Sequence, residues 1–138
     1  MIYADNAATT KMSKTAIDAM LPYMEEYYGN PSSLYAFAQK AKEALEDART
    51  RVAACIGAEP REIYFTSGGS EADNQAIMSA ARSGERKGKR HIISTAFEHH
   101  AVLHTLDKLK ERGFEITLLD VHADGIVTPE QVAEALRE

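Results

Sequence analysis

The second half of the sequence alternates between short β-prone runs and longer segments with helical periodicity. Strands are predicted at 62–66, 91–95 and 114–119, and helices at 70–82 and 99–112. A turn at 124–125 and a helix start at 128–131, with a Thr N-cap, Pro at the first position and Gln three residues after the cap, are also predicted. Alternation at this spacing predicts right-handed strand–helix–strand units whose strands pair in parallel. The predicted fold class is therefore α/β with a largely parallel sheet. Because a parallel sheet needs cover on both faces and three strands are few for that, the sequence is expected to be the front part of a larger α/β protein.

Residues 1–60 are predicted to form an N-terminal helical segment, followed by the start of an incomplete α/β domain at 61–138. One helix is expected at 13–27, where an internal proline should introduce a kink. A dense turn signal occupies 29–33. A long helix should follow it and end near Gly57, because glycine readily supplies the left-handed cap.

The long helix before Gly57 carries a stripe of mostly small apolar residues. The stripe steps by three and four and consists of Ala38, Ala41, Leu45, Ala48, Val52 and Cys55. Small side chains permit a close approach, so another element is expected to pack against this face. Cys55 continues the stripe near the C-terminal end of the helix, where the dipole disfavours a thiolate. It is therefore expected to be a buried structural thiol and not a nucleophile.

A glycine-rich turn separates the first predicted strand from the helix that follows it, with Gly68 and Gly69 side by side and Ser70 at the predicted N-cap. A helix start carries unpaired N–H groups and a partial positive charge, and glycine lets a ligand approach the backbone. The turn is neither a Walker A loop nor the dinucleotide fingerprint. Two interpretations stay open, namely a phosphate cradle and a turn whose serine is only a cap. Glu71 and Asp73 would repel a phosphate unless their side chains point away.

His99 follows the second predicted strand. Ligands of open α/β sheets collect beyond the carboxyl ends of strands, where both His99 and the glycine-rich turn are predicted to lie. A helix start disfavours the imidazolium, so we expect a neutral ring that can stack on an aromatic ligand and exchange protons with it. The alternative is a histidine bonded only to nearby backbone, and the neighbouring cradle favours the first interpretation. His100 and His104 are four residues apart, but a third ligand is not placed, so no metal site is predicted.

Composition excludes several functional classes. The net charge of −5 argues against a nucleic-acid-binding protein. No apolar stretch is long enough for a membrane span, and the first residues lack the pattern of a signal peptide. The single cysteine cannot form an internal disulfide and fits a reducing, cytoplasmic setting.

Four motifs occur together in a recognisable order and spacing. They are Tyr-Ala-Asp-Asn-Ala-Ala-Thr-Thr at 3–10, Gly-Asn-Pro-Ser-Ser at 29–33, Phe-Thr-Ser-Gly-Gly-Ser-Glu-Ala-Asp-Asn at 65–74 and Glu-His-His-Ala-Val-Leu at 98–103. With them the chain resembles the N-terminal third of a NifS/IscS-type cysteine desulfurase, a class V member of the fold-type I enzymes that use pyridoxal 5′-phosphate (PLP). The resemblance implies part of the fold-type I large domain. It also implies a homodimeric, cytoplasmic enzyme that takes sulfur from L-cysteine, leaves alanine and an enzyme persulfide, and serves a sulfur-acceptor protein in iron–sulfur cluster assembly or cofactor thiolation.

The resemblance also implies roles for individual residues. Gly69 and Ser70 match the pair that binds the PLP phosphate. His99 matches the histidine that stacks on the pyridine ring and is proposed to move protons. Four further positions match segments near the mouth of the active site and are candidates for the substrate pocket: Asn6, Ala7, Thr9 and Asn30.

The sequence also departs from the family pattern. The family's Schiff-base lysine follows a histidine, and no histidine here precedes a lysine. The family's residues that bind the PLP ring have no counterparts in this sequence, and neither does its persulfide cysteine, because Cys55 does not match that position. In addition, Tyr35, Ala38 and His100 stand where other residues are frequent in the family. The chain alone is therefore expected to be inactive and to bind PLP weakly or not at all. Alternatives are a selenocysteine lyase or other class V enzyme, and a non-catalytic α/β module that binds a phosphate ligand or a partner protein.

Overall fold

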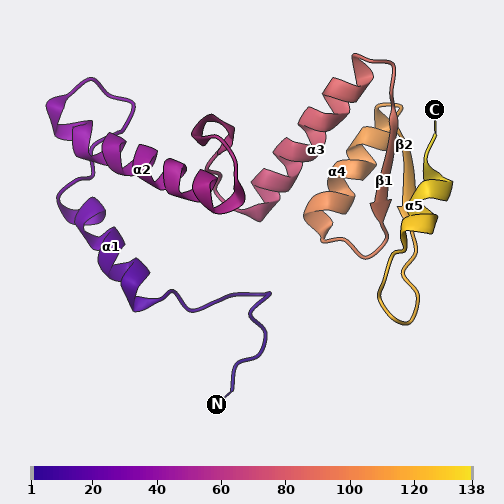
Figure 1. Cartoon of the computed structure of the whole chain (residues 1–138), viewed down its shortest axis with the longest axis horizontal. Coiled ribbons are helices and arrows are strands. Elements are labelled where there is room, and N and C mark those ends of the chain that lie inside the picture. Colours follow the sequence, from indigo (N-terminus) through magenta and orange to yellow (C-terminus); the bar gives the residue numbers. More distant parts are fainter. Residues whose placement is uncertain (1, 138) are drawn as a thin grey trace. The chain divides into compact units, whose positions relative to one another are not determined.

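The computed structural model describes residues 2–137, which fall into two compact units, the first ending at Tyr64 and the second beginning at Phe65. The elements in chain order are α1 (Lys14–Glu25), η1 (Ala36–Ala38), α2 (Gln39–Ile56), η2 (Pro60–Glu62), α3 (Gly69–Glu85), β1 (His91–Thr95), α4 (His100–Glu111), β2 (Glu115–Leu119) and α5 (Pro129–Ala135), where η marks a 3₁₀ helix (Figure 1). Because the strands pair in parallel between helices, the predicted α/β fold class is confirmed. Across the described residues, no helix is both long enough and apolar enough to cross a membrane.

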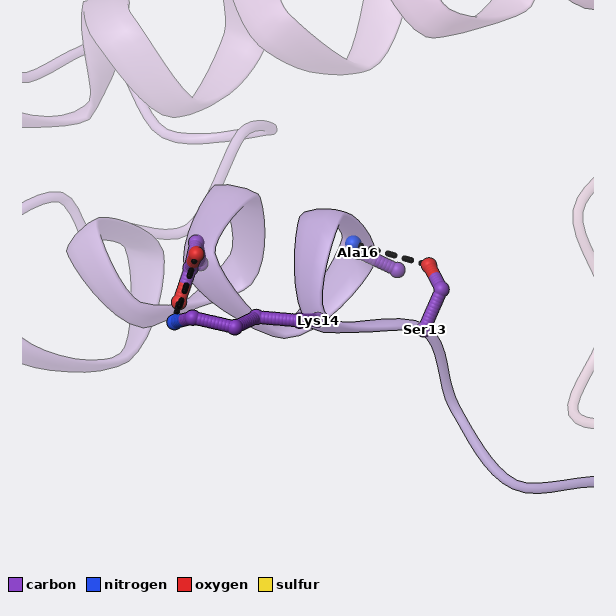
Figure 2. A network of polar contacts seen from close by, with 4 residues as sticks. Ser13, Lys14 and Ala16 are labelled. Atoms are coloured by element: carbon purple, nitrogen blue, oxygen red, sulfur yellow. Dashed lines mark hydrogen bonds and ion pairs between the residues drawn. The ribbon is translucent and has the colours of Figure 1, made fainter.

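Helix α1 begins where its sequence provides an N-cap. The Ser13 hydroxyl accepts a hydrogen bond from the Ala16 N–H at 3.1 Å, which satisfies one of the unpaired donors of the first turn (Figure 2). The Lys14 ammonium pairs with the Asp18 carboxylate one turn further on, at 2.8 Å. The helix matches the predicted range within two residues and includes Pro22.

Gly29 allows two backbone segments of the first unit to approach closely. A Cβ at this position would lie 2.7 Å from the Ala38 Cα and 3.1 Å from the Phe37 Cδ1. Both Gly29 and Ala38 are buried, so neither segment has open space in which to retreat. The glycine in the predicted turn is therefore required by packing.

We expect Gly29→Ala to destabilise the first unit by about 1–3 kcal/mol, because an added methyl group overpacks a closed contact. Near-ultraviolet circular dichroism during denaturation should report the loss, since Tyr28 and Phe37 pack edge to face with ring centroids 5.0 Å apart beside this contact. Gly69→Ala is the matched control, because a Cβ at that position meets no described atom within 4 Å beyond its chain neighbours and the backbone of its own helix. Equal midpoints for the two variants would contradict the packing argument.

Helix α2 ends as predicted, but its buried face differs from the prediction. Gly57 adopts the left-handed conformation with φ +67° and caps the helix. Within the described residues, the stripe is buried at Ala38 and exposed at Val52 and Cys55, so the expectation of a buried Cys55 is wrong. The buried residue in this part of the helix is Ala53, whose carbonyl accepts the N–H of Ala58 as the chain turns back after the cap. The returning segment with η2 packs against α2, while Val52 and Cys55 of the stripe stay exposed.

The strand predicted at 62–66 is not a strand in the structure. Residues Pro60–Glu62 form η2, whose capping box joins the backbone and carboxylates of Glu59 and Glu62. The Ile63 carbonyl accepts a hydrogen bond from the Arg49 guanidinium. This bond occupies a backbone acceptor that would otherwise pair with the N–H of a neighbouring strand. An apolar run becomes a strand only when another strand pairs with its backbone. Here a side chain of the first unit, that of Arg49, binds a carbonyl of the run instead.

The second unit contains the sheet and its core. Among the described residues the sheet has two strands where three were predicted, and the register places Ile92 opposite Ile116. Helices α3 and α4 lie side by side and pack on one face of β1 and β2 (Figure 1). The core consists of Ala81, Leu109 and Phe114, with Ile77, Met78, Ile92 and Ile116 packed around them. Helix α3 begins one residue before and ends three residues after its predicted range, whereas α4 lies one residue inside its own at each end.

The last helix, α5, starts at the predicted signal. The Thr128 hydroxyl accepts the Gln131 N–H at 3.3 Å, and the Gln131 side chain accepts the Thr128 N–H at 2.9 Å. This reciprocal capping box, with Pro129 in the first turn, confirms the prediction. The predicted turn before it is also present, with Gly125 at φ +71°.

Candidate functional site

A cavity of about 320 Å³ lies between the starts of α3 and α4 in the second unit. Its walls combine hydroxyl, amide, imidazole and ammonium groups from the two helices. The lining residues are Ser70, Asn74, His99, His100, Ala101, His104, Thr105 and Lys108. The structure thus brings the predicted residues Ser70 and His99 to one cavity, with Gly69 directly before the first of them.

The start of α3 differs in detail from the prediction. The N-cap is Gly68 and not Ser70, which is the second residue of the helix. Gly68 makes no side-chain capping bond, and the Glu71 carboxylate instead accepts both the Ser67 hydroxyl at 2.6 Å and the Ser67 N–H at 2.7 Å, just before the helix. The Ser70 hydroxyl is consequently not used as a cap and is left to line the cavity.

The first turn of α3 presents backbone donors. The first intrahelical bond runs from the Ala72 N–H to the Gly68 carbonyl at 3.1 Å, so the N–H groups of Gly69 and Ser70 precede the helical ladder. Apart from the adjoining residues and the backbone of α3 itself, no described atom lies within 4 Å of a Cβ built at Gly68 or Gly69. Open space, unpaired donors and the positive end of the helix dipole together form a site suited to an anion.

Glu71 adds a negative charge beside this helix start. Hydrogen bonds from Ser67, from its hydroxyl first and its backbone N–H second, hold the pKa of the Glu71 carboxyl below its ordinary value of 4.5. The group is therefore ionised at neutral pH, although its side chain turns toward Ser67. An anionic ligand must bind in the presence of this charge, which water screens because the carboxylate is exposed.

We expect the Ser67 amide resonance to titrate with a midpoint below 4.5, the ordinary pKa of Glu71. Because the pKa is lowered, the Glu71–Ser67 contact contributes its full stabilisation of the fold at pH values above the ordinary pKa of the carboxyl group. That contribution is lost as the pH falls through the lowered pKa. NMR spectra between neutral and strongly acidic pH measure the midpoint, and Glu71→Gln should abolish the transition. A midpoint at or above the ordinary value would contradict the hydrogen-bonded geometry.

His99 caps α4 with its side chain. Its backbone is extended, with φ −62° and ψ 150°, and its Nδ1 accepts the Ala101 N–H at 3.1 Å. In this arrangement the hydrogen of the neutral ring is assigned to Nε2. One ring nitrogen thus bonds nearby backbone, as the second interpretation expects, while the ring also lines the cavity. Stacking on a ligand stays a prediction.

Two further histidines lie beside the cavity. The rings of His100 and His104 stack with centroids 5.2 Å apart and an interplanar angle of 16°. Within the described part of the chain, no group of three or more histidine, cysteine or acidic side chains is arranged to hold a metal ion.

The predicted substrate-pocket residues belong to the first unit, where each lies in an exposed local turn. The Asn6 carbonyl accepts the Thr10 hydroxyl at 3.1 Å, and Asn30 Oδ1 accepts the Ser32 N–H at 2.9 Å. Ala7 and Thr9 are exposed in the same N-terminal segment as Asn6. These contacts shape the two turns.

Sequence reasoning missed Asn74, Thr105 and Lys108 as parts of the cavity wall. A usable signal existed for the first of them, because Asn74 stands four residues after Ser70 and hence on the same helix face. Thr105 has the same relation to Ala101. A polar residue four positions after a candidate residue at a helix start is therefore the sequence signal that could identify such wall residues.

Comparisons with known proteins agree with one another. The family model described as aminotransferase class-V matches residues 2–138. The chain is 50% identical to cysteine desulfurase IscS of Methanosarcina thermophila, over 99% of its own length and 34% of that protein's. Among solved structures, a NifS-like protein matches with a TM-score of 0.90 and 36% identity, covering 97% of this chain and 36% of the other. A structure described as SspA in complex with cysteine matches with a TM-score of 0.89 and 38% identity, covering 98% and 39%.

Proposed function

Because the chain belongs to the aminotransferase class-V family, we propose that it supplies the phosphate-binding and ring-stacking part of a PLP-dependent cysteine desulfurase. It spans about a third of the length of its curated relative, at 34%. The relative's name supports the desulfurase activity, and the cysteine in the SspA structure supports L-cysteine as the substrate. The α/β fold agrees with the large domain of fold-type I enzymes, whose start we place at residues 61–138 after a helical segment at 1–60.

One observation carries this proposal, namely the shared cavity of Ser70 and His99. The donors before the α3 ladder suit the phosphate of PLP, and the Ser70 hydroxyl adds a further donor. The imidazole of His99 offers a flat surface for the pyridine ring of the cofactor. The residues present therefore fit a ligand that combines an anionic tail with an aromatic ring.

Each residue has a defined part in the proposal. The N–H groups of Gly69 and Ser70 would bind the phosphate and fix the register of the cofactor. His99 would orient the ring and hold a proton at Nε2, because Nδ1 is engaged by Ala101. PLP, when bound, supplies an electron sink for the chemistry at the substrate's α-carbon.

Several parts of the proposal extend beyond the cavity. Asn6, Ala7, Thr9 and Asn30 are proposed substrate-pocket residues. The working enzyme is proposed to be a cytoplasmic homodimer that passes sulfur to an acceptor protein for iron–sulfur cluster assembly. A selenocysteine lyase or another class V enzyme is the nearest alternative. The SspA structure contains cysteine, so the comparison with it does not discriminate against selenocysteine as a substrate.

We expect the 138-residue chain to release no alanine from L-cysteine in the presence of PLP, because no histidine in it precedes a lysine. Pyridoxine 5′-phosphate lacks the aldehyde that would label surface lysines, so it is the suitable probe of binding. In an NMR titration it should shift the Gly69, Ser70 and His99 resonances, with weak affinity. Saturable shifts confined to residues elsewhere would contradict the proposal. In a separate incubation with PLP itself, a borohydride-trapped imine formed at one lysine would contradict it as well.

A further inference from the structure

A single side-chain amide joins the starts of α3 and α4. The Asn74 Nδ2 donates to the Ser70 carbonyl at 2.7 Å and lies 3.4 Å from the Ala101 carbonyl. The first contact is within α3, and the second crosses to α4. Asn74 therefore connects the turn that carries the proposed phosphate site to the turn that carries His99.

The connection continues to the imidazole. The Ala101 N–H donates to His99 Nδ1 at 3.1 Å, so the same residue contacts Asn74 through its carbonyl and His99 through its N–H. A continuous series of hydrogen bonds consequently runs from Ser70 through Asn74 and Ala101 to the ring of His99. All four residues line the cavity.

Thr105 bonds the oxygen end of the Asn74 amide, whose orientation is fixed by the Ser70 and Ala101 carbonyls. Its hydroxyl lies 2.7 Å from Asn74 Oδ1 and 2.8 Å from the Ala101 carbonyl, and the residue is only 3% exposed. The hydroxyl has one hydrogen, which lies toward these two acceptors. A flipped amide would place Asn74 Oδ1 against the carbonyls of Ser70 and Ala101, where neither atom can donate. The Nδ2 group must therefore face the two carbonyls.

We propose that Asn74, held at its Oδ1 by the Thr105 hydroxyl, is a positioning residue that sets the separation between Ser70 and His99. A ligand that carries both an anionic group and a flat ring needs both residues at a fixed spacing, whereas inorganic phosphate needs only the start of α3. The role of Asn74 thus differs between the two ligands. The choice of a PLP-like ligand rests on the proposed function.

The test compares Asn74→Leu and Thr105→Val with Thr105→Ser, which keeps the hydroxyl. Loss of one hydrogen bond in the network corresponds to about a fivefold change in affinity. Both disruptive variants should bind pyridoxine 5′-phosphate about fivefold more weakly and keep their affinity for inorganic phosphate within about twofold. Thr105→Ser should behave like the unsubstituted chain in both titrations. A parallel loss for both ligands, or no loss for either, would overturn the proposal.

A ligand-free measurement separates this proposal from the proposed function. In Asn74→Leu the Ala101 amide should exchange with solvent about fivefold faster or more, while the amide of Leu109 in the core remains protected. Unchanged exchange at Ala101 would overturn the link between the helix starts, whatever the ligand results. If the unsubstituted chain binds inorganic phosphate and pyridoxine 5′-phosphate equally, the ring-stacking part of the proposed function fails, and the Ala101 exchange rate still decides the role of Asn74.

Discussion

Gly69→Pro is expected to weaken the binding of pyridoxine 5′-phosphate by about 10-fold to 100-fold. A hydrogen bond to a charged group contributes roughly 1.5–3 kcal/mol, and proline removes the N–H of the first helical residue. That position otherwise tolerates proline, because its N–H has no partner within the helix. The preceding residue is compatible as well, since Gly68 is extended with φ 162° and ψ 179°.

Gly69→Ala provides the matched control for this experiment. It adds a side chain in open space but keeps the backbone N–H, so its affinity should stay much closer to that of the unsubstituted chain. Circular dichroism should show that both variants retain α3. Equal affinities for Gly69→Pro and Gly69→Ala would show that the backbone N–H of residue 69 does not bind the phosphate.

The largest loss of stability is expected for Leu109→Ala. Leu109 is 2% exposed and lies in the core cluster with Ala81 and Phe114. Truncating a buried leucine costs about 2–5 kcal/mol, since apolar contacts are lost and a cavity remains. A free energy of unfolding of about 5–15 kcal/mol is typical of whole proteins, so the second unit should lose a large part of its stability.

Hydrogen exchange localises this effect to the second unit. The Leu106 amide in α4 should lose protection in Leu109→Ala, because exchange of core amides follows the stability of the surrounding unit. Leu118→Ala is the matched control, since Leu118 is 46% exposed and its truncation should cost much less. Similar protection in the two variants would show that the cluster around Leu109 does not stabilise this unit.

The parts of the fold that were predictable from sequence depend on local chemistry. The serine cap of α1, the left-handed Gly57 and the capping box of α5 each require only neighbouring residues, and all three are present. The prediction failed for residues 62–66 and for Cys55, where the outcome depends on which distant segment packs against them. The Arg49 contact with Ile63 joins residues 14 positions apart and has no periodic signature.

The candidate site was predictable to a similar extent. The rule that ligands collect beyond strand ends applies to His99, which follows β1. It fails for the glycine-rich turn, because the predicted strand at 62–66 before it is not a strand, and only the residue types of that turn indicated a site. The details depend on contacts between helices, such as that of Asn74 with Thr105, which are 31 residues apart in the sequence. The prediction of Ser70 as the N-cap is also wrong, since α3 begins at Gly69 with Gly68 as its N-cap.

Cys55 is exposed and is the only cysteine in the chain, which makes the first unit chemically addressable at one defined atom. A maleimide dye or spin label should attach with single stoichiometry and leave the second unit unmodified. Without a reducing agent, dissolved oxygen can oxidise the Cys55 thiols of two chains to an intermolecular disulfide. Preparations kept in air should therefore gain a covalent band at twice the mass in non-reducing gels, and dithiothreitol should remove it.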